Sequence, residues 1–149
     1  MRRAIVSGYF NPLHGGHLDL IEGAHELADK IIVIVNNDKQ QMLKKGKIIL
    51  PEHNRVRLMK ALKFVDEVIL SIDTGRPVIN TMESIAKRYP LDELIFCQGG
   101  DVANDEENPE AEVCRKYGIK IVYEVGVNGT GTTKADSSTR INQALGLQK

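Results

Sequence analysis

An unbroken run of β-branched residues constrains the fold of this chain more than any other feature. Residues 31–35 read Ile-Ile-Val-Ile-Val, without the apolar and polar alternation of a half-exposed strand. Such a strand is covered on both faces, which is typical of a parallel sheet enclosed by helices. Further apolar runs predict four more strands, at 3–7, 68–72, 94–97 and 120–125.

Apolar residues at helical spacing separate these strands. They predict helices at 17–28, 51–65, 77–90, 110–117 and 137–145. The Lys-rich segment 39–50 shows no clear period and is predicted to be a mobile loop. Because strands and helices alternate without a repeat or linker, we expect one α/β domain over residues 1–149. Its doubly wound, five-stranded parallel sheet would carry helices on both faces and bind ligands beyond the carboxyl ends of the strands.

Composition argues against nucleic acid and membranes as partners. Twenty basic and 20 acidic residues cancel, and only 5% of residues are aromatic, with no Trp to stack on bases. No apolar run approaches the roughly 20 residues of a membrane span, and no signal-peptide core follows the first residues. We therefore expect a cytoplasmic protein in which Cys97 and Cys114 are reduced, partly buried thiols.

The turn after the first strand carries the strongest chemical signal. It reads Gly-Tyr-Phe-Asn-Pro-Leu-His-Gly-Gly-His over residues 8–17. His14 and His17 project to the same side at a helix start, and Gly15 and Gly16 let a phosphate approach the backbone amides. The helix N-terminus and two imidazole donors suit a polyanion.

Two other interpretations of these histidines remain at this point. They could simply cap the helix or fill space, or they could chelate zinc. The sequence shows no third zinc ligand nearby, and Cys97 and Cys114 belong to other elements. A pair of histidines flanking two glycines favours phosphate binding.

Segment 8–17 resembles the Gly-aromatic-acid/amide-x-x-His-x-Gly-His signature of the cytidylyltransferase-like nucleotidyltransferases. Three further segments resemble motifs of that family in the same order: Arg55, Gly99-Gly100-Asp101 and Asp136 to Arg140. The resemblance covers nearly the whole chain. It implies a Rossmann-like sheet and transfer of a nucleoside monophosphate from a nucleoside triphosphate, with release of pyrophosphate.

The resemblance also implies roles for individual residues. His14 and His17 would stabilise the transition state at the α-phosphorus, Lys44 or Lys45 would reach the phosphates, and Mg²⁺ would accompany the triphosphate. Arg140 would act with Ser137, Ser138 and Thr139 on the β- and γ-phosphates. The remaining expected nucleotide contacts are Gly8, Tyr9, Phe10, Gly16, Arg55, Gly100 and Asp101.

Two residues depart from the family pattern: Tyr9 replaces a small Ser or Thr, and Asn11 replaces a frequent Asp. Segments 35–38 and 64–68 look closest to the glycerol-phosphate cytidylyltransferase and heptose-nucleotide branches. We therefore expect transfer of CMP from CTP to a phosphorylated alcohol or sugar, by a protein that can form a homodimer. The alternatives are an adenylyltransferase that uses ATP on a phosphorylated small molecule, and a non-catalytic nucleotide-binding module marked by the two departures.

Overall fold

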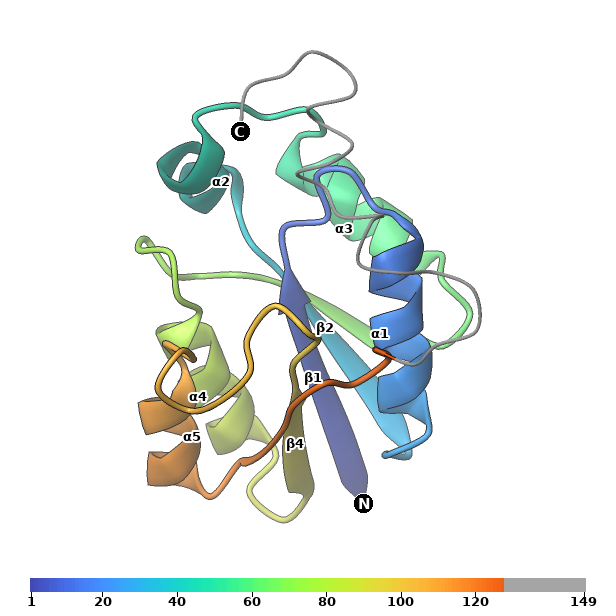
Figure 1. Ribbon diagram of the computed structural model, residues 1–149, viewed down its shortest axis with the longest axis vertical. Helices are drawn as coiled ribbons and strands as arrows, with labels where there is room; N and C mark the ends of the chain where they lie inside the picture. The colour runs from blue at the N-terminus through green and yellow to red at the C-terminus, as the bar shows by residue number, and fades with distance from the viewer. Residues whose placement is uncertain (128–149) are drawn as a thin grey trace.

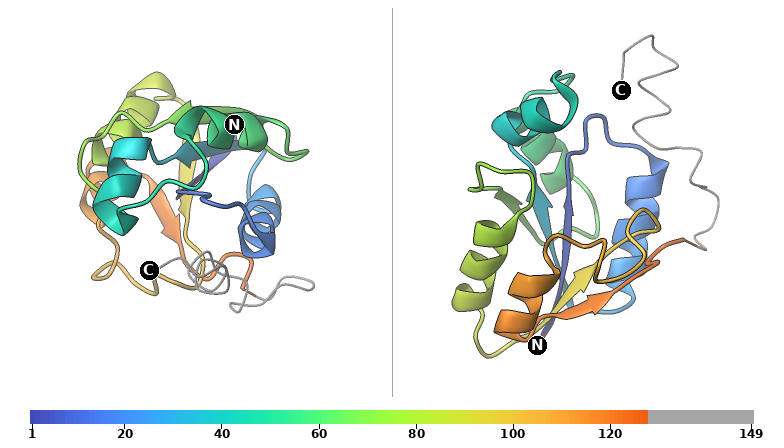
Figure 2. Two further views of the ribbon diagram at one scale, coloured as in Figure 1. Left: turned by 90° about the horizontal axis from the view of Figure 1, so that it is seen from above. Right: turned by 60° about the vertical axis from the view of Figure 1, so that its left-hand side comes forward.

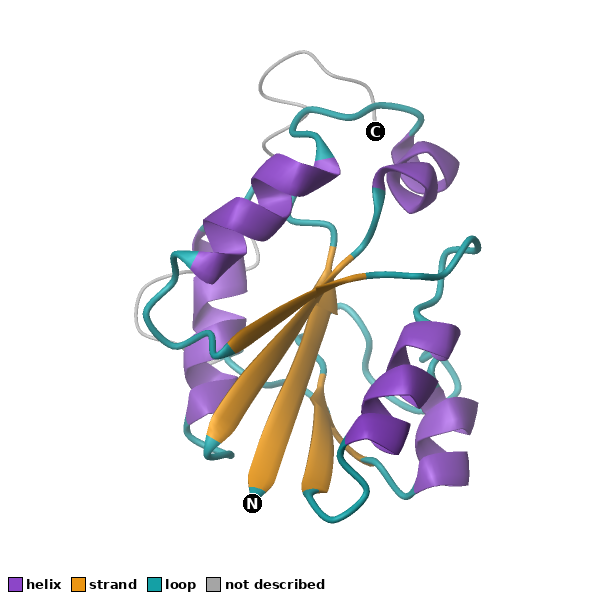
Figure 3. Ribbon diagram, turned by 180° about the vertical axis from the view of Figure 1, so that it is seen from behind, coloured by secondary structure: helices purple, strands orange, loops and turns teal. Residues whose placement is uncertain are grey.

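Five parallel strands form the central layer of the computed structural model, which describes residues 1–127. Their order across the sheet is β3-β2-β1-β4-β5, so the chain winds outward from β1 in one direction and then returns to place β4 on the other side of β1 (Figure 3). The doubly wound sheet is thus confirmed. The strands are β1 (Arg2–Gly8), β2 (Lys30–Val35), β3 (Glu67–Leu70), β4 (Glu93–Cys97) and β5 (Lys120–Val122).

Helices cover both faces of this sheet. On one face lie α1 (Gly15–His25) and α3 (Glu52–Lys60), and on the other lie α4 (Ile79–Arg88) and α5 (Ala111–Tyr117) (Figure 1). A further helix, α2 (Asp38–Lys45), lies beyond the carboxyl ends of the strands rather than on a face (Figure 2). No described helix is long and apolar enough to cross a membrane.

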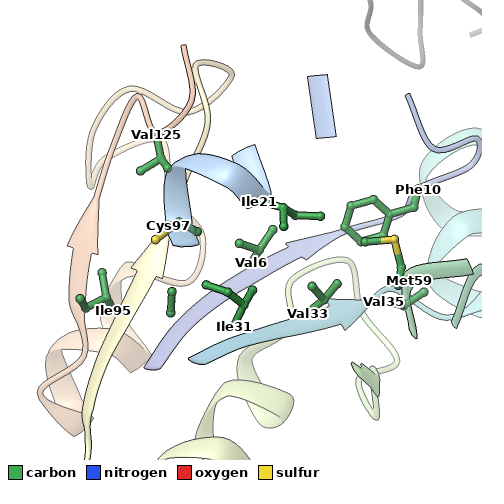
Figure 4. Close-up of a cluster of buried hydrophobic side chains, with 12 residues drawn as sticks. Val6, Phe10, Ile21, Ile31, Val33, Val35, Met59, Ile95, Cys97 and Val125 are labelled. Atoms are coloured by element: carbon green, nitrogen blue, oxygen red, sulfur yellow. The ribbon is translucent and has the colours of Figure 1, made fainter. Parts of the chain in front are cut away.

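Strand β2 supplies both halves of the core, as its unbroken apolar run predicts. Ile31, Val33 and Val35 belong to the cluster beneath α1 and α3, which Figure 4 shows. Ile32 and Ile34 belong to the cluster beneath α4 and α5. All five side chains are fully buried. Alternating residues of one strand therefore hold the two helical layers together.

The prediction of a mobile loop over residues 39–50 was wrong for its first half, which is helix α2. Asn37 and Gln40 form a capping box: the Asn37 side chain accepts from Gln40 N at 2.8 Å, and Gln40 Oε1 accepts from Asn37 N at 2.9 Å. Gly46, at φ 71°, ends the helix. The helix shows no apolar period because its buried residues are the polar Gln40 and Gln41.

Element ends shift from expectation in smaller ways. The fifth strand was predicted to reach residue 125 but ends at Val122. The predicted helix at 137–145 lies outside the described residues.

Cys97 and Cys114 are free and buried, and desolvation raises the pKa of each thiol to about 12, so both stay protonated.

The segment after β5 packs tightly against α1 at Gly126. This residue has φ 75°, and a Cβ built on it would lie 2.4 Å from the Asp19 backbone oxygen and 2.8 Å from Leu20 N. Gly118 has a similar φ of 69°, but a Cβ there would meet nothing within 4 Å. A substitution at Gly118 would therefore report backbone strain alone, whereas one at Gly126 would report backbone strain together with steric overlap.

We predict that Gly126→Ala lowers the free energy of unfolding by clearly more than Gly118→Ala does. Left-handed backbone alone costs a non-glycine residue of order 1–3 kcal/mol, and only Gly126→Ala adds a collision with the α1 backbone. Urea unfolding of both variants measures the difference. Equal losses would mean that residue 126 does not pack against α1 as described.

Candidate active site

A cavity of about 760 Å³ opens at the carboxyl ends of β1 and β4. These strands are adjacent, and the winding direction of the sheet reverses between them. Open α/β sheets bind ligands at this position, because the loops leaving the two strands diverge to opposite faces. The cavity walls come from the β1–α1 turn, α2, the segment leading into α4, and the loops after β4 and β5.

Most of the residues expected from the sequence line this cavity. Those within the described part of the chain are Gly8, Tyr9, Phe10, His14, Gly16, His17, Lys44, Lys45, Gly100 and Asp101. Ser137, Ser138, Thr139 and Arg140 lie outside the described residues. Sequence reasoning missed several lining residues that no motif marks, among them Asn36, Gln41, Arg76, Gln98 and Glu110.

The two histidines cap α1 with one ring nitrogen each. His14 Nδ1 accepts from Gly16 N, and His17 Nδ1 accepts from His14 N, both at 3.1 Å. The rings stack with centroids 3.7 Å apart. An Nδ1 that accepts a hydrogen bond carries no proton, so each neutral imidazole holds its proton on Nε2. The capping bonds therefore do not use the Nε2–H group of either ring, and capping and ligand binding are compatible.

His17 is held in its neutral form. Burial, reinforced by the neighbouring His14 and by the positive charge of Lys44, lowers the pKa of His17 to about 3. Phe10 contributes to that burial, since its ring meets the His17 ring edge-on at 4.8 Å between centroids. At neutral pH His17 is thus a hydrogen-bond donor without a full charge.

Positive charge comes instead from the end of α2. Lys44 and Lys45 both line the cavity, and Lys44 Nζ lies 4.3 Å from the centre of the Tyr9 ring. Partial burial and the charges of Lys45 and Arg76 lower the pKa of Lys44, while Asp101 opposes them. These cations stay close together against mutual repulsion, which favours an anionic ligand between them.

Of the two residues that depart from the family pattern, Asn11 has a structural role. Its side chain is buried, and Oδ1 accepts from Ile49 N at 3.0 Å and from Leu50 N at 2.7 Å. A carboxylate could accept the same two bonds, so an amide at this position preserves the contact. Tyr9 is half-buried in the cavity wall beneath Lys44, where a small residue would leave more room.

Arg55 was expected to contact the nucleotide, but the structure places it beneath the cavity and not in its lining. Its side chain is fully buried. The guanidinium donates to the backbone oxygens of Leu50, Tyr9 and Asn36 at 2.8, 2.8 and 2.5 Å, and pairs with Asp38 Oδ1 at 2.7 Å. Arg55 therefore joins the chain segments that leave β1 and β2 to the start of α2.

The parallel sheet, the paired imidazoles at the N-terminus of α1 and the lysines at the end of α2 together form a site suited to a phosphate-bearing ligand. Comparison with known families identifies it further. Residues 5–144 match the family described as Cytidylyltransferase-like, and the chain belongs to that family. The protein is a nucleotidyltransferase, as the sequence motifs predicted.

Two of the relatives that the chain matches are FAD synthases. The FAD synthase of Thermococcus kodakarensis is 34% identical over 118 residues, which is 78% of this chain and 74% of that protein. The FAD synthase of Archaeoglobus profundus is 36% identical over 121 residues, or 80% and 70% of the two chains. Among solved structures, the lipopolysaccharide core biosynthesis protein of Thermoplasma volcanium aligns with TM-score 0.64 at 30% identity, covering 83% of this chain and 95% of that one.

We predict that Arg55→Leu destabilises the fold by about 3–5 kcal/mol, because it leaves Asp38 and three backbone oxygens without their buried hydrogen-bond donor. Arg57→Leu on the same helix is the control, since Arg57 is exposed and should cost less than about 0.5 kcal/mol. Urea unfolding tests both. An Arg55→Leu protein of normal stability that binds nucleotide weakly would support direct nucleotide contact instead.

We also predict that His17 makes stability fall on acidification. Its folded-state pKa lies well below the unfolded value of about 6.5. Between pH 6.5 and 3 the unfolded chain therefore binds a proton that the folded chain does not, and the free energy of unfolding decreases as the pH falls. In a urea titration over this range, His17→Asn should show a shallower pH dependence than wild type. Parallel curves would contradict a buried, neutral His17.

Proposed function

We propose that this enzyme is an adenylyltransferase that transfers AMP from ATP to flavin mononucleotide (FMN), forming FAD and pyrophosphate. The observation that carries the choice of substrates is the similarity to FAD synthases over about four-fifths of the chain. It supports the ATP alternative over the CTP reaction that the sequence segments suggested. The coarser activity, nucleotidyl transfer, is common to both.

The described residues support a direct displacement. A phosphate oxygen of FMN attacks the α-phosphorus of ATP, and the bond from that phosphorus to the bridging oxygen breaks, so pyrophosphate leaves with the electron pair. Negative charge grows on the oxygens around the α-phosphorus. The Nε2–H groups of His14 and His17 are fixed donors for that charge, and the N-terminus of α1 adds its partial positive charge.

The lysines of α2 would neutralise the phosphates from the opposite wall. Lys44 and Lys45 line the cavity in the last turn of a helix that is capped at its start. From there they would act mainly by attracting the phosphates and positioning the two reactants. No side chain in this scheme forms a covalent bond with substrate.

Mg²⁺ fits this scheme as a companion of the triphosphate. Mg²⁺ usually keeps several waters and binds through substrate phosphates plus one or two carboxylates. Among residues 1–127 no group of three or more His, Cys, Asp or Glu is arranged to hold a metal ion, whereas Asp19 and Asp101 line the cavity. Either carboxylate would serve as a protein contact of the nucleotide-bound ion, whose charge would offset that of the phosphates.

We predict that the purified protein forms FAD from FMN and ATP, with CTP giving little product. Product analysis by chromatography, together with pyrophosphate release, measures both reactions. His17→Ala should lower kcat by about 10²–10³-fold, the usual loss for one donor to a developing oxyanion. His53→Ala is the matched control, because His53 is exposed on α3 and does not line the cavity.

Three results would contradict the proposal. Faster pyrophosphate release with CTP and a phosphorylated sugar or alcohol than with ATP and FMN would favour the cytidylyltransferase reaction. Release with ATP and another phosphorylated acceptor, but not with FMN, would reject the flavin. Tight nucleotide binding without pyrophosphate release from any pair of substrates would contradict catalysis itself.

A further inference from the structure

The side chain of Gln41 has an unsatisfied polar atom in the wall of the cavity. Gln41 is only 2% exposed, yet it contributes to the cavity lining. Within residues 1–127, its Oε1 is the one buried side-chain oxygen or nitrogen without a hydrogen-bond partner. Leaving such an atom unpaired costs about 1–3 kcal/mol, so it calls for an explanation.

The neighbouring residue shows that this is not a general property of α2. Gln40 is equally buried, but its amide is fully used: Oε1 accepts from Asn37 N, and Nε2 donates to the Gly75 oxygen at 2.7 Å. Asn37 Nδ2 also donates to the backbone oxygens of Ser71 and Asp73 at 3.0 and 2.8 Å. These bonds fix α2 against the segment leading into α4, so Gln41 has little freedom to turn elsewhere.

The position of Gln41 suggests which substrate it meets. Helix α2 and the segment leading into α4 lie on one side of the carboxyl end of β1, and α1 lies on the other (Figures 1 and 2). The imidazole donors belong to the α1 side. A reaction between two substrates needs room on both sides of the reacting phosphorus, and Gln41 lines the side away from α1 together with Arg76.

We propose that Gln41 determines specificity for the acceptor substrate, with Oε1 accepting a hydrogen bond from an N–H or O–H group of that molecule. The inference rests on the proposed function, and with FMN the available donors are the imide N–H of the flavin ring and the ribityl hydroxyls. An imide edge also offers carbonyl oxygens to the Nε2 donor of the same amide. A purely apolar or purely anionic acceptor would leave Oε1 unpaired.

Gln41→Met tests this assignment, since methionine has a similar length and no polar amide. We expect KM for FMN to rise about tenfold, the equivalent of one hydrogen bond of roughly 1.4 kcal/mol, while KM for ATP changes less than twofold. Without substrates the variant should melt at or above the wild-type temperature, because an unpaired buried oxygen has been removed. The control is Leu43→Met, which changes an exposed residue of the same helix.

Two FMN analogues would identify which group of FMN donates the hydrogen bond to Gln41 Oε1. One is methylated at the imide nitrogen, and the other lacks ribityl hydroxyls. Wild type should discriminate against one of them, and Gln41→Met should lose that discrimination. Unchanged discrimination in the variant, a rise in KM for ATP alone, or a lowered melting temperature would each overturn the role of Gln41. Failure of wild type to form any FAD would instead reject the proposed function, and this result is obtained before any variant is compared.

Discussion

The hydrogen bonds that cap helix α1 are the interaction on which the site depends. Two backbone N–H groups at the start of this helix bind Nδ1 of His14 and Nδ1 of His17. The same bonds satisfy the helix terminus, orient both rings and leave the ring protons on Nε2. Burial then keeps His17 neutral. A requirement of the fold thereby produces two donors of fixed direction beside the partial positive charge of a helix N-terminus.

A second polar arrangement holds the opposite wall. Arg55 joins the segments leaving β1 and β2 to Asp38 at the start of α2, and the Asn37–Gln40 capping box continues that connection into the helix. The last turn of α2 then presents lysines to the cavity. Rigid support on both sides suits a reaction that is accelerated by positioning and electrostatics, because little reorganisation remains when charge develops. Arg55 does not line the cavity, and it would contribute to ligand binding indirectly, by holding the chain segments that do.

The choice between ATP and CTP depends on different residues from those that determine the reaction class. The reaction depends on phosphate-binding groups, which occur in short motifs with recognisable spacing. Under our proposal, the acceptor is distinguished by single hydrogen bonds from residues such as Gln41, which belongs to no motif and is recognised only because it lines the cavity. Similarity to FAD synthases and one unpaired amide oxygen both point toward an acceptor with hydrogen-bond donors.

The sequence by itself determined the sheet, its enclosure on both faces and the paired histidines, and its resemblance to a known family indicated the reaction class. These follow from local signals, namely an apolar run in β2 and a glycine-histidine turn after β1. Only the tertiary structure decided that residues 38–45 form a helix, that Arg55 lies under the site and that Gln41 lies in its wall. The physical reason is that burial of a polar residue depends on partners far along the chain: Arg55 bonds to Tyr9 and Gln40 to Gly75, and no local pattern encodes either contact.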